Sequence, residues 1–432
     1  MENNRKVLLK VEHLEQFFKL GRKQVTRAVN DVNFEIYKGE VFGLVGESGC
    51  GKTTTGRSII RLHDITGGSV YFDGKRIAAG TRRYKEAIKV AKAQAEAEKK
   101  QYKEELIEAI KNGEDEAKAQ EEYKDKCKES TERLIEIVKT NTEEIKKARY
   151  DHKNCNKEFA KYQMSLVEKE YAPKLEAAKA EGPEAYEAME KEYKEKLRLA
   201  KKDRIMNKIQ MIFQDPIASL DPRMTVRDII AEGLIIRGIK NKKEIDEKVF
   251  KILDTVGLVP EHASRYPHEF SGGQRQRIGI ARAIILEPEL IIADEPISAL
   301  DVSIQAQIIN LLNELSEKMG LTTLFIAHDL AVVKYFSHRI AVMYYGNIVE
   351  LATSDELFAH PLHPYTKSLL SAIPLPDPYF EKKRKRIIYN PIASHDCSVE
   401  RPTLKEITPG HFVSCNTEEF NKYKAELENS QE

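Results

Sequence analysis

A glycine-rich segment near the start of the chain has the residue types and spacing of a phosphate-binding loop. Residues 46–53 read GESGCGKT and fit the pattern G-x-x-x-x-G-K-[ST]. Glycines let backbone N–H groups converge on phosphate oxygens, and a following helix points its positive end at them. A chance glycine-rich turn is the alternative, but the apolar run before the loop and the helical pattern after it favour phosphate binding. The predicted contacts are Gly46, Ser48, Gly49, Cys50, Gly51, Lys52, Thr53 and Thr54.

Two acidic residues at the end of an apolar run supply the groups that hydrolysis needs. Residues 290–295 read LIIADE. At the carboxyl end of a buried strand, Asp294 can face a Mg²⁺ ion, to which Thr53 offers a hydroxyl. Glu295 can then face the attacking water, while Lys52 places its charge on the terminal phosphates. A strand that ends in a solvated acidic turn is the alternative, and the phosphate loop upstream favours the catalytic interpretation.

A third motif, FSGGQ at residues 270–274, precedes the basic amphipathic segment RQRIGIARAII. Serine and glycine N–H groups at a helix start form a second anion site. Because one phosphate loop already serves one nucleotide, a second phosphate clamp suggests a site shared between two subunits. An ordinary helix cap with turn glycines explains the same residues, and the motif alone leaves both possibilities open.

Alternating strand and helix patterns position these motifs. Apolar runs typical of buried strands lie at 41–45, 209–213, 290–294 and 321–328, and further strand patterns lie at 6–12, 30–37 and 67–77. Helical patterns lie at 52–62, 224–258, 275–287 and 302–319. The alternation predicts an α/β fold with a mostly parallel sheet.

The composition limits the classes of partner. The 70 basic and 69 acidic residues leave a formal net charge of +1, which gives no overall attraction to nucleic acid or anionic lipid. Charge is concentrated in residues 81–200, with 28 basic and 28 acidic residues. Five scattered cysteines favour a reducing compartment. The N-terminal residues lack the apolar stretch of a signal peptide, and no run approaches the ~20 apolar residues of a membrane span.

The order of the motifs is highly specific. SGGQ upstream of LIIADEP, Gln214 within IFQDP, SALD at 298–301 and IAH at 326–328 together resemble the nucleotide-binding subunit of ABC transporters. Residues 210–234 and 360–374 look like its oligopeptide/dipeptide permease branch, and the first stretch favours the OppF/DppF-type subunit. Residues 402–415 are similar to the C-terminal tail of that branch. The resemblance implies an ABC-type P-loop ATPase domain with a RecA-like core, an antiparallel β subdomain and a helical subdomain.

The resemblance also implies roles for matching residues. Phe18 would stack on adenine, although it could be a core aromatic beside Phe17. Gln214 would sense Mg²⁺ and the attacking water and relay their state to membrane subunits. His328 would contact the γ-phosphate from a strand end. Asp301 would organise a dimer interface, with a simple helix N-cap as the alternative.

The signature residues Ser271, Gly272, Gly273 and Gln274 would contact the nucleotide held by the opposite subunit. Phe270 replaces the leucine usual in this family and keeps an apolar contact. No catalytic position is degenerate, so we expect an active ATPase. Its predicted catalytic residues are Glu295, His328, Gln214 and Lys52, and its predicted Mg²⁺ ligands are Thr53, Gln214 and Asp294.

The cysteines depart from the family pattern. Many relatives carry four cysteines in the tail, suited to an iron–sulfur cluster. This chain has Cys397 and Cys415 there, so we expect no cluster. His395 and His411 could complete a zinc set, but their spacing is not a recognised one. Cys50 lies at a helix start beside the loop lysine, which could lower its pKa and make alkylation inhibitory; an inert filler is the alternative.

A charged segment at about 81–204 interrupts the predicted ATPase domain. Its flanks must lie close together, so the segment must go out and return. Strong helix propensity and apolar residues spaced by three or four predict an antiparallel helical hairpin or small coiled coil, rather than a disordered linker. Two arms of about 60 residues would reach roughly 90 Å. Breaks near residues 112–113, Asn141 and residues 182–183 argue for shorter, bent arms.

The expected organisation has four parts. Residues 1–80 and 205–358 form the two parts of the ATPase domain, 81–204 the inserted hairpin and 359–432 a C-terminal extension. The resemblance implies the ATP-hydrolysing motor of an oligopeptide or dipeptide importer that uses ATP and Mg²⁺. The implied partners are two transmembrane permease subunits, a second ATPase subunit in a heterodimer and an extracytoplasmic peptide-binding protein, with no nucleic acid. The expected location is the cytoplasmic face of the cell membrane, as a peripheral subunit.

Two alternatives remain at this point. One is a soluble coiled-coil ABC ATPase of DNA maintenance, but in that class the coiled coil follows the glutamine loop, whereas here the charged segment precedes Gln214. The other is an importer for nickel. The transported substrate and the partner of the insertion do not follow from the sequence.

Overall fold

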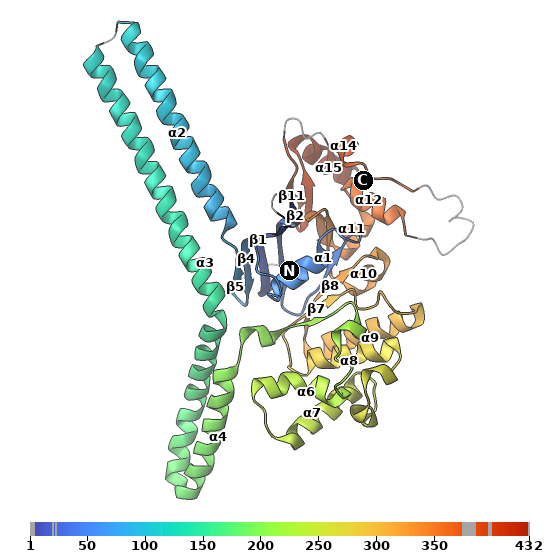
Figure 1. Ribbon diagram of the computed structural model, residues 1–432. Coiled ribbons are helices and arrows are strands. Elements are labelled where there is room, and N and C mark those ends of the chain that lie inside the picture. Colours follow the sequence, from blue (N-terminus) through green and yellow to red (C-terminus); the bar gives the residue numbers. More distant parts are fainter. Residues whose placement is uncertain are drawn as a thin grey trace.

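The computed structural model describes residues 5–19, 21, 24–113, 115–373, 386–395 and 400–430. Over these residues the chain forms an α/β body and a long helical unit that passes along one side of it (Figure 1). The α/β class and the helical insertion predicted from the sequence are confirmed. Among the same residues, no helix combines the length and apolar character that crossing a membrane requires.

The larger sheet positions the chemistry. Its order over the described residues is β11-β12-β10-β9-β3-β8-β7-β6, and the strands from β9 to β6 are parallel. The parallel strands carry the apolar runs found in the sequence and are buried on both faces. Their bounds are β3 Val41–Val45, β6 Ile209–Ile212, β7 Leu290–Asp294, β8 Thr322–Ala327 and β9 Arg339–Tyr344; β10 Asn347–Thr353, β11 Thr403–Thr408 and β12 His411–Cys415 continue the sheet in antiparallel fashion.

A smaller antiparallel sheet has the order β2-β1-β4-β5. Its strands are β1 Val7–Lys19, β2 Val25–Tyr37, β4 Gly67–Phe72 and β5 Lys75–Ala79. Apolar side chains of this sheet share one core with β3, β8 and the helix α1 (Lys52–Ile59), so the two sheets pack as neighbouring layers.

A helical subdomain follows β6. It contains α5 Pro216–Ser219, α6 Val226–Arg237, α7 Lys242–Thr255, the 3₁₀ turns Pro260–Ser264 and Pro267–Glu269, and α8 Gly272–Ile284. Helices α9 Val302–Met319, α10 Leu330–Phe336, α11 Ser354–Ala359 and α12 Pro364–Ser371 surround the larger sheet, and α14 Pro391–Ser394 and α15 Thr417–Ser430 belong to the C-terminal part. The C-terminal part is not a loose tail, because β12 pairs with β10 and extends the main sheet.

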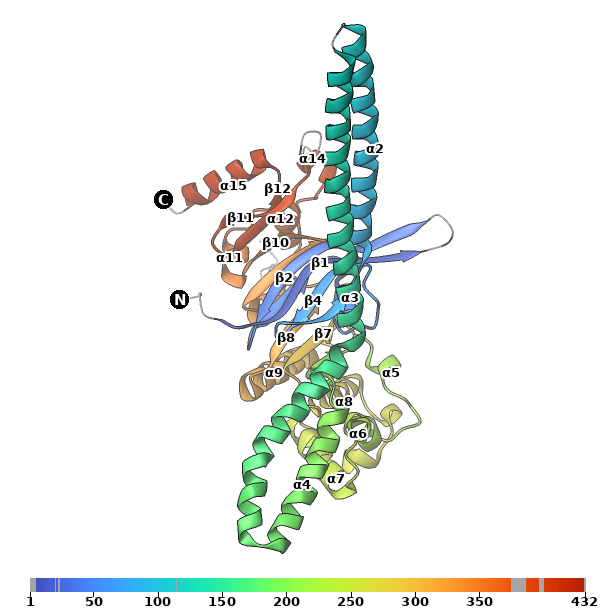
Figure 2. The ribbon, with the colours of Figure 1, turned by 90° about the vertical axis from the view of Figure 1, so that its left-hand side faces the viewer.

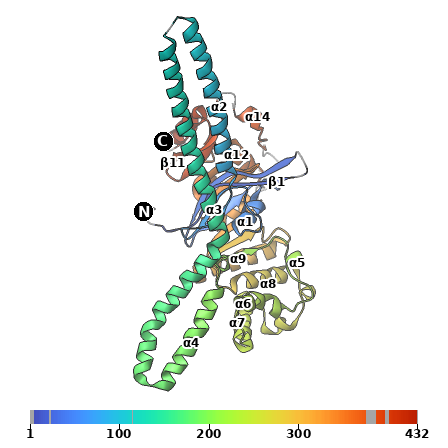
Figure 3. The same cartoon turned by 60° about the vertical axis from the view of Figure 1, so that its left-hand side comes forward.

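The insertion consists of α2 Arg82–Lys111, α3 Glu116–Glu181 and α4 Pro183–Lys202. Figures 1 and 2 show that the N-terminal part of α3 pairs with α2 and projects to one side of the body. The C-terminal part of α3 pairs with α4 and projects to the opposite side. Figure 3 gives the same arrangement from an intermediate angle. The insertion therefore forms two hairpins that share one helix.

This arrangement corrects the single hairpin with two arms. The turns near residues 112–113 and at Gly182 are where the sequence placed them, but α3 continues through Asn141. The Asn141 side chain donates to the Ile137 carbonyl one turn earlier and stays within the helix. At about 1.5 Å per residue, the 66 residues of α3 span about 100 Å.

Candidate active site

Four neighbouring parallel strands deliver the predicted catalytic residues to one edge of the sheet. The phosphate loop follows β3, Asp294 ends β7, Gln214 lies just after β6 and His328 just after β8. The carboxyl ends of parallel strands lie at the same edge, so residues separated by almost 300 positions in the sequence come together there. The predicted site residues remain predictions in their roles, and the structure gives their geometry.

The phosphate loop is held by close backbone contacts. A Cβ atom at Gly46 would lie 2.1 Å from the Met343 carbonyl oxygen, so only glycine fits at that position. Gly51, with φ of 110°, is the N-cap of α1 in a left-handed conformation that glycine adopts without strain. The buried Lys52 Nζ donates to the carbonyl oxygens of Gly46 and Glu47 at 2.7 and 2.9 Å.

Asp294 and Thr53 form a buried oxygen pair. The Thr53 hydroxyl donates to Asp294 Oδ1 at 2.8 Å, and Asp294 Oδ2 is buried without a hydrogen-bond partner. Burial raises the pKa of Asp294, and the bond from Thr53 acts in the opposite direction. An unpaired buried carboxylate oxygen beside a hydroxyl is a set of hard oxygen donors, which suits Mg²⁺.

Glu295 is the centre of the polar site. Its Oε2 accepts from Gln214 Nε2 at 3.0 Å and lies 3.3 Å from His328 Nδ1, and its Oε1 lies 3.8 Å from Lys52 Nζ. The backbone of Glu295 has φ of 44°, which is unusual for a residue with a side chain, and its N–H donates to the Ile326 carbonyl. This turn directs the carboxylate along the sheet edge toward the phosphate loop.

The signature residues lie at the start of α8. Ser271 is its N-cap, and the Ser271 and Gln274 side chains each bond to the other's backbone N–H. A Cβ atom at Gly273 would lie 2.6 Å from Ile304 Cγ2, so this turn packs closely on the start of α9. Asp301 is the N-cap residue of α9 by position, yet its side chain makes no capping bond, which does not favour the simple N-cap alternative.

Phe18 lies near the end of β1, outside both large cores. It is half-buried and packs edge-on against His63, with ring centroids 5.4 Å apart. Phe17 lies beneath the Arg82 guanidinium, 4.3 Å from its ring centroid. This half-exposed position does not favour the alternative of a core aromatic.

Cys50 differs from the reactive thiol considered above. Burial raises the pKa of the Cys50 thiol, and the charge of Lys52, whose Nζ lies 3.9 Å from Sγ, only opposes that effect. Only 6% of the residue is exposed. The lowered pKa is therefore wrong, and the geometry fits the alternative of an inert filler.

The C-terminal histidines have partners other than a metal. His411 Nε2 lies 2.8 Å from the fully buried Glu350, and His395 contacts Glu419 and Tyr389. Over the described residues, no three His, Cys, Asp or Glu side chains gather as a metal site requires. Cys397, a member of the proposed zinc set, lies outside the described residues.

Sequence reasoning missed one contact with the phosphate loop. The Tyr365 hydroxyl accepts from the Glu47 backbone N–H at 3.1 Å, although 318 positions separate the two residues. Tyr365 is almost fully buried and packs against Tyr344, with ring centroids 4.4 Å apart. Its segment, HPYTKSLL, stood out in the sequence as a family marker, but no spacing rule connects it to the loop.

The fold and the site together define an ATP-binding cassette ATPase. Residues 29–170 and 186–298 match the profile of the family described as ABC transporter, and residues 349–397 match that of the oligopeptide/dipeptide transporter C-terminal region. The chain belongs to the ABC transporter family and carries this C-terminal region. Both matches confirm the resemblance found in the sequence.

Relatives align over nearly the full chain. The oligopeptide transport ATP-binding protein OppF of Bacillus subtilis is 44% identical over 417 residues, covering 96% of this chain and 98% of the relative. OppF of Streptococcus mutans is 41% identical, covering 98% and 99%, and the dipeptide transport ATP-binding protein DppF of Lactococcus lactis is 40% identical, covering 97% of each. A solved ATP-binding cassette in a post-hydrolysis state with ADP and Pi is 21% identical with a TM-score of 0.47, covering 80% of this chain and 99% of the solved one.

Proposed function

We propose that this chain is the ATP-hydrolysing motor subunit of an importer for oligopeptides or dipeptides. The observation that carries the proposal is the position of Glu295, which contacts Gln214 and His328 at the strand ends beside the phosphate loop. In this assignment Glu295 polarises the attacking water, His328 contacts the γ-phosphate, and Lys52 neutralises the charge that develops on the phosphates.

Thr53, Asp294 and Gln214 would hold Mg²⁺. The fit rests on the buried unpaired Oδ2 of Asp294 and on the Thr53 hydroxyl beside it. A Mg²⁺ ion bound there supplies positive charge that stabilises the phosphoryl group during transfer. The phosphate loop, through Gly46, Ser48, Gly49, Cys50, Gly51 and Thr54, would bind the remaining phosphate oxygens.

The signature residues Ser271, Gly272, Gly273 and Gln274 would contact the nucleotide of a second ATPase subunit, with Asp301 at the interface and Phe18 against adenine. The N-terminus of α8 and the uncommitted side chain of Asp301 support a site of this kind. ATP would then join two subunits head to tail, and its hydrolysis would release them.

The names of the relatives support the partners that the sequence resemblance implies. Proteins named for oligopeptide and dipeptide transport align over nearly all of this chain. We therefore assign to this chain two transmembrane permease subunits, a second and different ATPase subunit, and a peptide-binding protein outside the membrane. The proposed location is the cytoplasmic face of the membrane, with residues 1–80 and 205–358 as the ATPase domain, 81–204 as the insertion and 359–432 as the extension.

The two alternatives have less support. The relatives given above are named for peptide transport, which favours peptide import over both DNA maintenance and nickel import. The C-terminal match to an oligopeptide/dipeptide transporter region also favours peptide import.

Replacing Glu295 by Gln tests the catalytic assignment. The amide keeps the contacts to Gln214 and His328 but is a poor base, so phosphate release should fall by about 100-fold or more while ATP binding is kept. Glu289→Gln, at the opposite end of β7, is the matched control and should leave the rate unchanged. Equal rates for the Glu295→Gln variant and the parent protein would contradict the assignment.

Affinity purification of the tagged full-length chain from membranes in mild detergent tests the transport assignment. We expect mass spectrometry to identify two permease subunits and a second ATPase. Recovery of DNA-maintenance proteins without a permease would overturn it.

A further inference from the structure

The inserted helices contact the body at three separate places. Two places belong to the part that would bind the nucleotide, and the third belongs to the helical subdomain that carries the signature. Figure 2 shows α3 passing in front of the antiparallel sheet between these regions. We call these three places anchors, and the contacts at each one show which element of the body the insertion binds.

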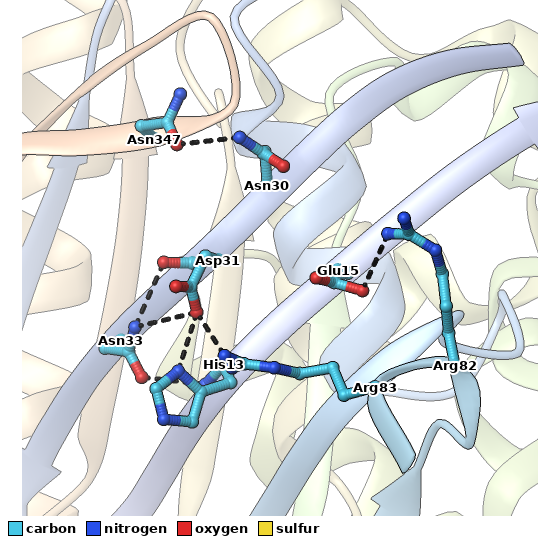
Figure 4. A network of polar contacts seen from close by, with 8 residues as sticks. All are labelled: His13, Glu15, Asn30, Asp31, Asn33, Arg82, Arg83 and Asn347. Carbon is cyan, nitrogen blue, oxygen red and sulfur yellow. Dashed lines mark hydrogen bonds and ion pairs between the residues drawn. The ribbon is translucent and has the colours of Figure 1, made fainter. Parts of the chain in front are cut away.

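The first anchor is the start of α2. Arg82 pairs with Glu15 of β1 at 3.1 Å, and its guanidinium stacks on Phe17, the residue before Phe18. Arg83 pairs with Asp31 of β2 at 3.2 Å, and Asp31 also contacts His13 at 2.6 Å (Figure 4). The start of α2 is therefore bound to β1, the strand whose C-terminal part carries Phe18, the proposed adenine contact.

The second anchor is the middle of α3. Arg61, just beyond α1, donates to Cys155 Sγ at 2.9 Å and to the His152 carbonyl at 2.8 Å. Arg76 of β5 pairs with Asp151 at 2.7 Å, and both Cys155 and Phe159 are buried in the core that α1 shares. The phosphate loop lies at the start of α1, so this anchor joins α3 to the far end of the helix that begins at the nucleotide site.

The third anchor is the end of α4. Arg198 donates to the Gly238 carbonyl at 2.9 Å, and the buried Asp203 lies 3.5 Å from Arg237. Gly238 is the C-cap of α6, and a Cβ atom there would lie 3.0 Å from Lys202. Helix α6 packs on α8, whose first residues are the signature.

We propose that the insertion is a mechanical link that couples the nucleotide contacts on β1 and α1 to the position of α6 and the signature helix. The proposal rests on the proposed function, since it requires that the phosphate loop binds ATP. The three anchors lie on three helices, and α3 packs against both α2 and α4, so a displacement at one anchor reaches the others through these helix–helix contacts. Arg82, Arg61 and Arg198 are positioning residues in this scheme, because each acts through a neighbour.

Hydrogen exchange of the full chain tests the link. In a Glu295→Gln background, which should retain ATP, amide exchange is measured with and without Mg-ATP. We expect slower exchange at 48–56, at 144–160 and at 226–236, by about fivefold or more in the last segment. The double variant Arg198→Ala/Arg237→Ala should lose most of the response at 226–236 and keep the response at 48–56.

The control is Lys126→Ala/Arg133→Ala. These residues pair with Glu105 and Glu98 across the α2–α3 hairpin, so the control removes two cations of the insertion and leaves all three anchors. It should respond like the parent protein, and Arg198→Lys, which keeps a donor for Gly238, should respond nearly as well. Circular dichroism should give all variants the same helix content.

Three results would overturn the inference. An unchanged response at 226–236 in the Arg198→Ala/Arg237→Ala variant would mean that the signal runs through residues 205–225 instead. Slower exchange at 48–56 without slower exchange at 144–160 would show that α3 is not coupled to the nucleotide site. Absence of any response at 48–56 would refute the proposed function itself, and the inference with it.

Discussion

Tyr365 connects the C-terminal region with the phosphate loop through one hydrogen bond. Its segment is also tied to β10, because the Tyr365 N–H donates to His363 Nδ1 and the His363 N–H donates to Glu350. The buried Glu350 in turn pairs with His411 of β12. A chain of polar contacts therefore leads from the C-terminal strands to the Glu47 N–H.

Replacing Tyr365 by Phe should raise the KM for ATP. The change removes the acceptor of the Glu47 N–H and costs about 1 kcal/mol, which corresponds to about fivefold in affinity, whereas kcat should change little. The measurement is phosphate release as a function of ATP concentration. Tyr389→Phe, which removes a hydroxyl that contacts His395, is the control, and equal KM values for the two variants would contradict the role of Tyr365.

The roles of the single site residues stay predictions, and they rest on local sequence motifs. The loop glycines, Lys52, Asp294 and Glu295 belong to short local motifs, so their types and spacing carry the information. The Tyr365 contact was not predictable, because it depends on how a distant helix packs. Cys50 was misjudged for the same reason: its burial, which raises its pKa, is a tertiary property.

Among the elements, α12 begins with a buried histidine cap that makes the stability of the fold depend on pH. His363 Nδ1 accepts the Tyr365 N–H at the start of this helix. Burial, with a smaller effect of His395, lowers the pKa of His363 to about 3, while an unfolded histidine has a pKa near 6.5. Below about pH 6.5 the unfolded chain binds a proton that the folded chain excludes, so acid should favour unfolding.

Replacing His363 by Asn should flatten this pH dependence. Asparagine keeps a cap acceptor but has no proton to bind. Between pH 6.5 and 5.5 the parent protein should lose about 1 kcal/mol of unfolding free energy more than the variant, and above pH 7.5 the slopes should agree. Urea denaturation followed by circular dichroism checks this, and parallel pH profiles would show that His363 titrates normally.

In the insertion, the sequence pattern predicted the helices but not how they pair. Propensity and the glycines at 113 and 182 predicted the helices and two of the turns. The pattern gave no sign that α3 would serve two hairpins, since a mostly polar helix with sparse apolar residues fits one partner as well as two. Asn141 was taken as a break, but in a helix held by neighbours its side chain bonds back to Ile137 at little cost.

At the scale of the molecule, the distal end of the α2–α3 hairpin lies far from the body (Figure 1). Its cross-helix contacts join the two helices to each other, as in Ser130 with Glu98 at 2.7 Å and Lys126 with Glu105 at 2.9 Å. The three anchors on the body involve other parts of the insertion. We therefore expect that the distal end of the hairpin can be removed without disturbing the three anchors.

Replacing residues 100–128 by a short Gly/Asn turn should leave the ATPase unaffected. Glu98 and Ser130 already lie opposite each other, so a turn can join the helices there without strain on the anchors. We expect the same melting temperature and the same rate of phosphate release, with a smaller hydrodynamic radius. A drop in ATPase rate with an unchanged melting temperature would show that the hairpin end takes part in catalysis.

Helix α3 lies along β5, the last strand of the smaller sheet. Without a neighbour, the outer strand of a sheet offers free backbone groups to any other chain and invites aggregation. Cys155 and Phe159 also cover apolar surface that would otherwise meet water. Removing the whole insertion would therefore expose this strand and the apolar surface beside it, so the insertion supports the solubility of the body independently of any signal it carries.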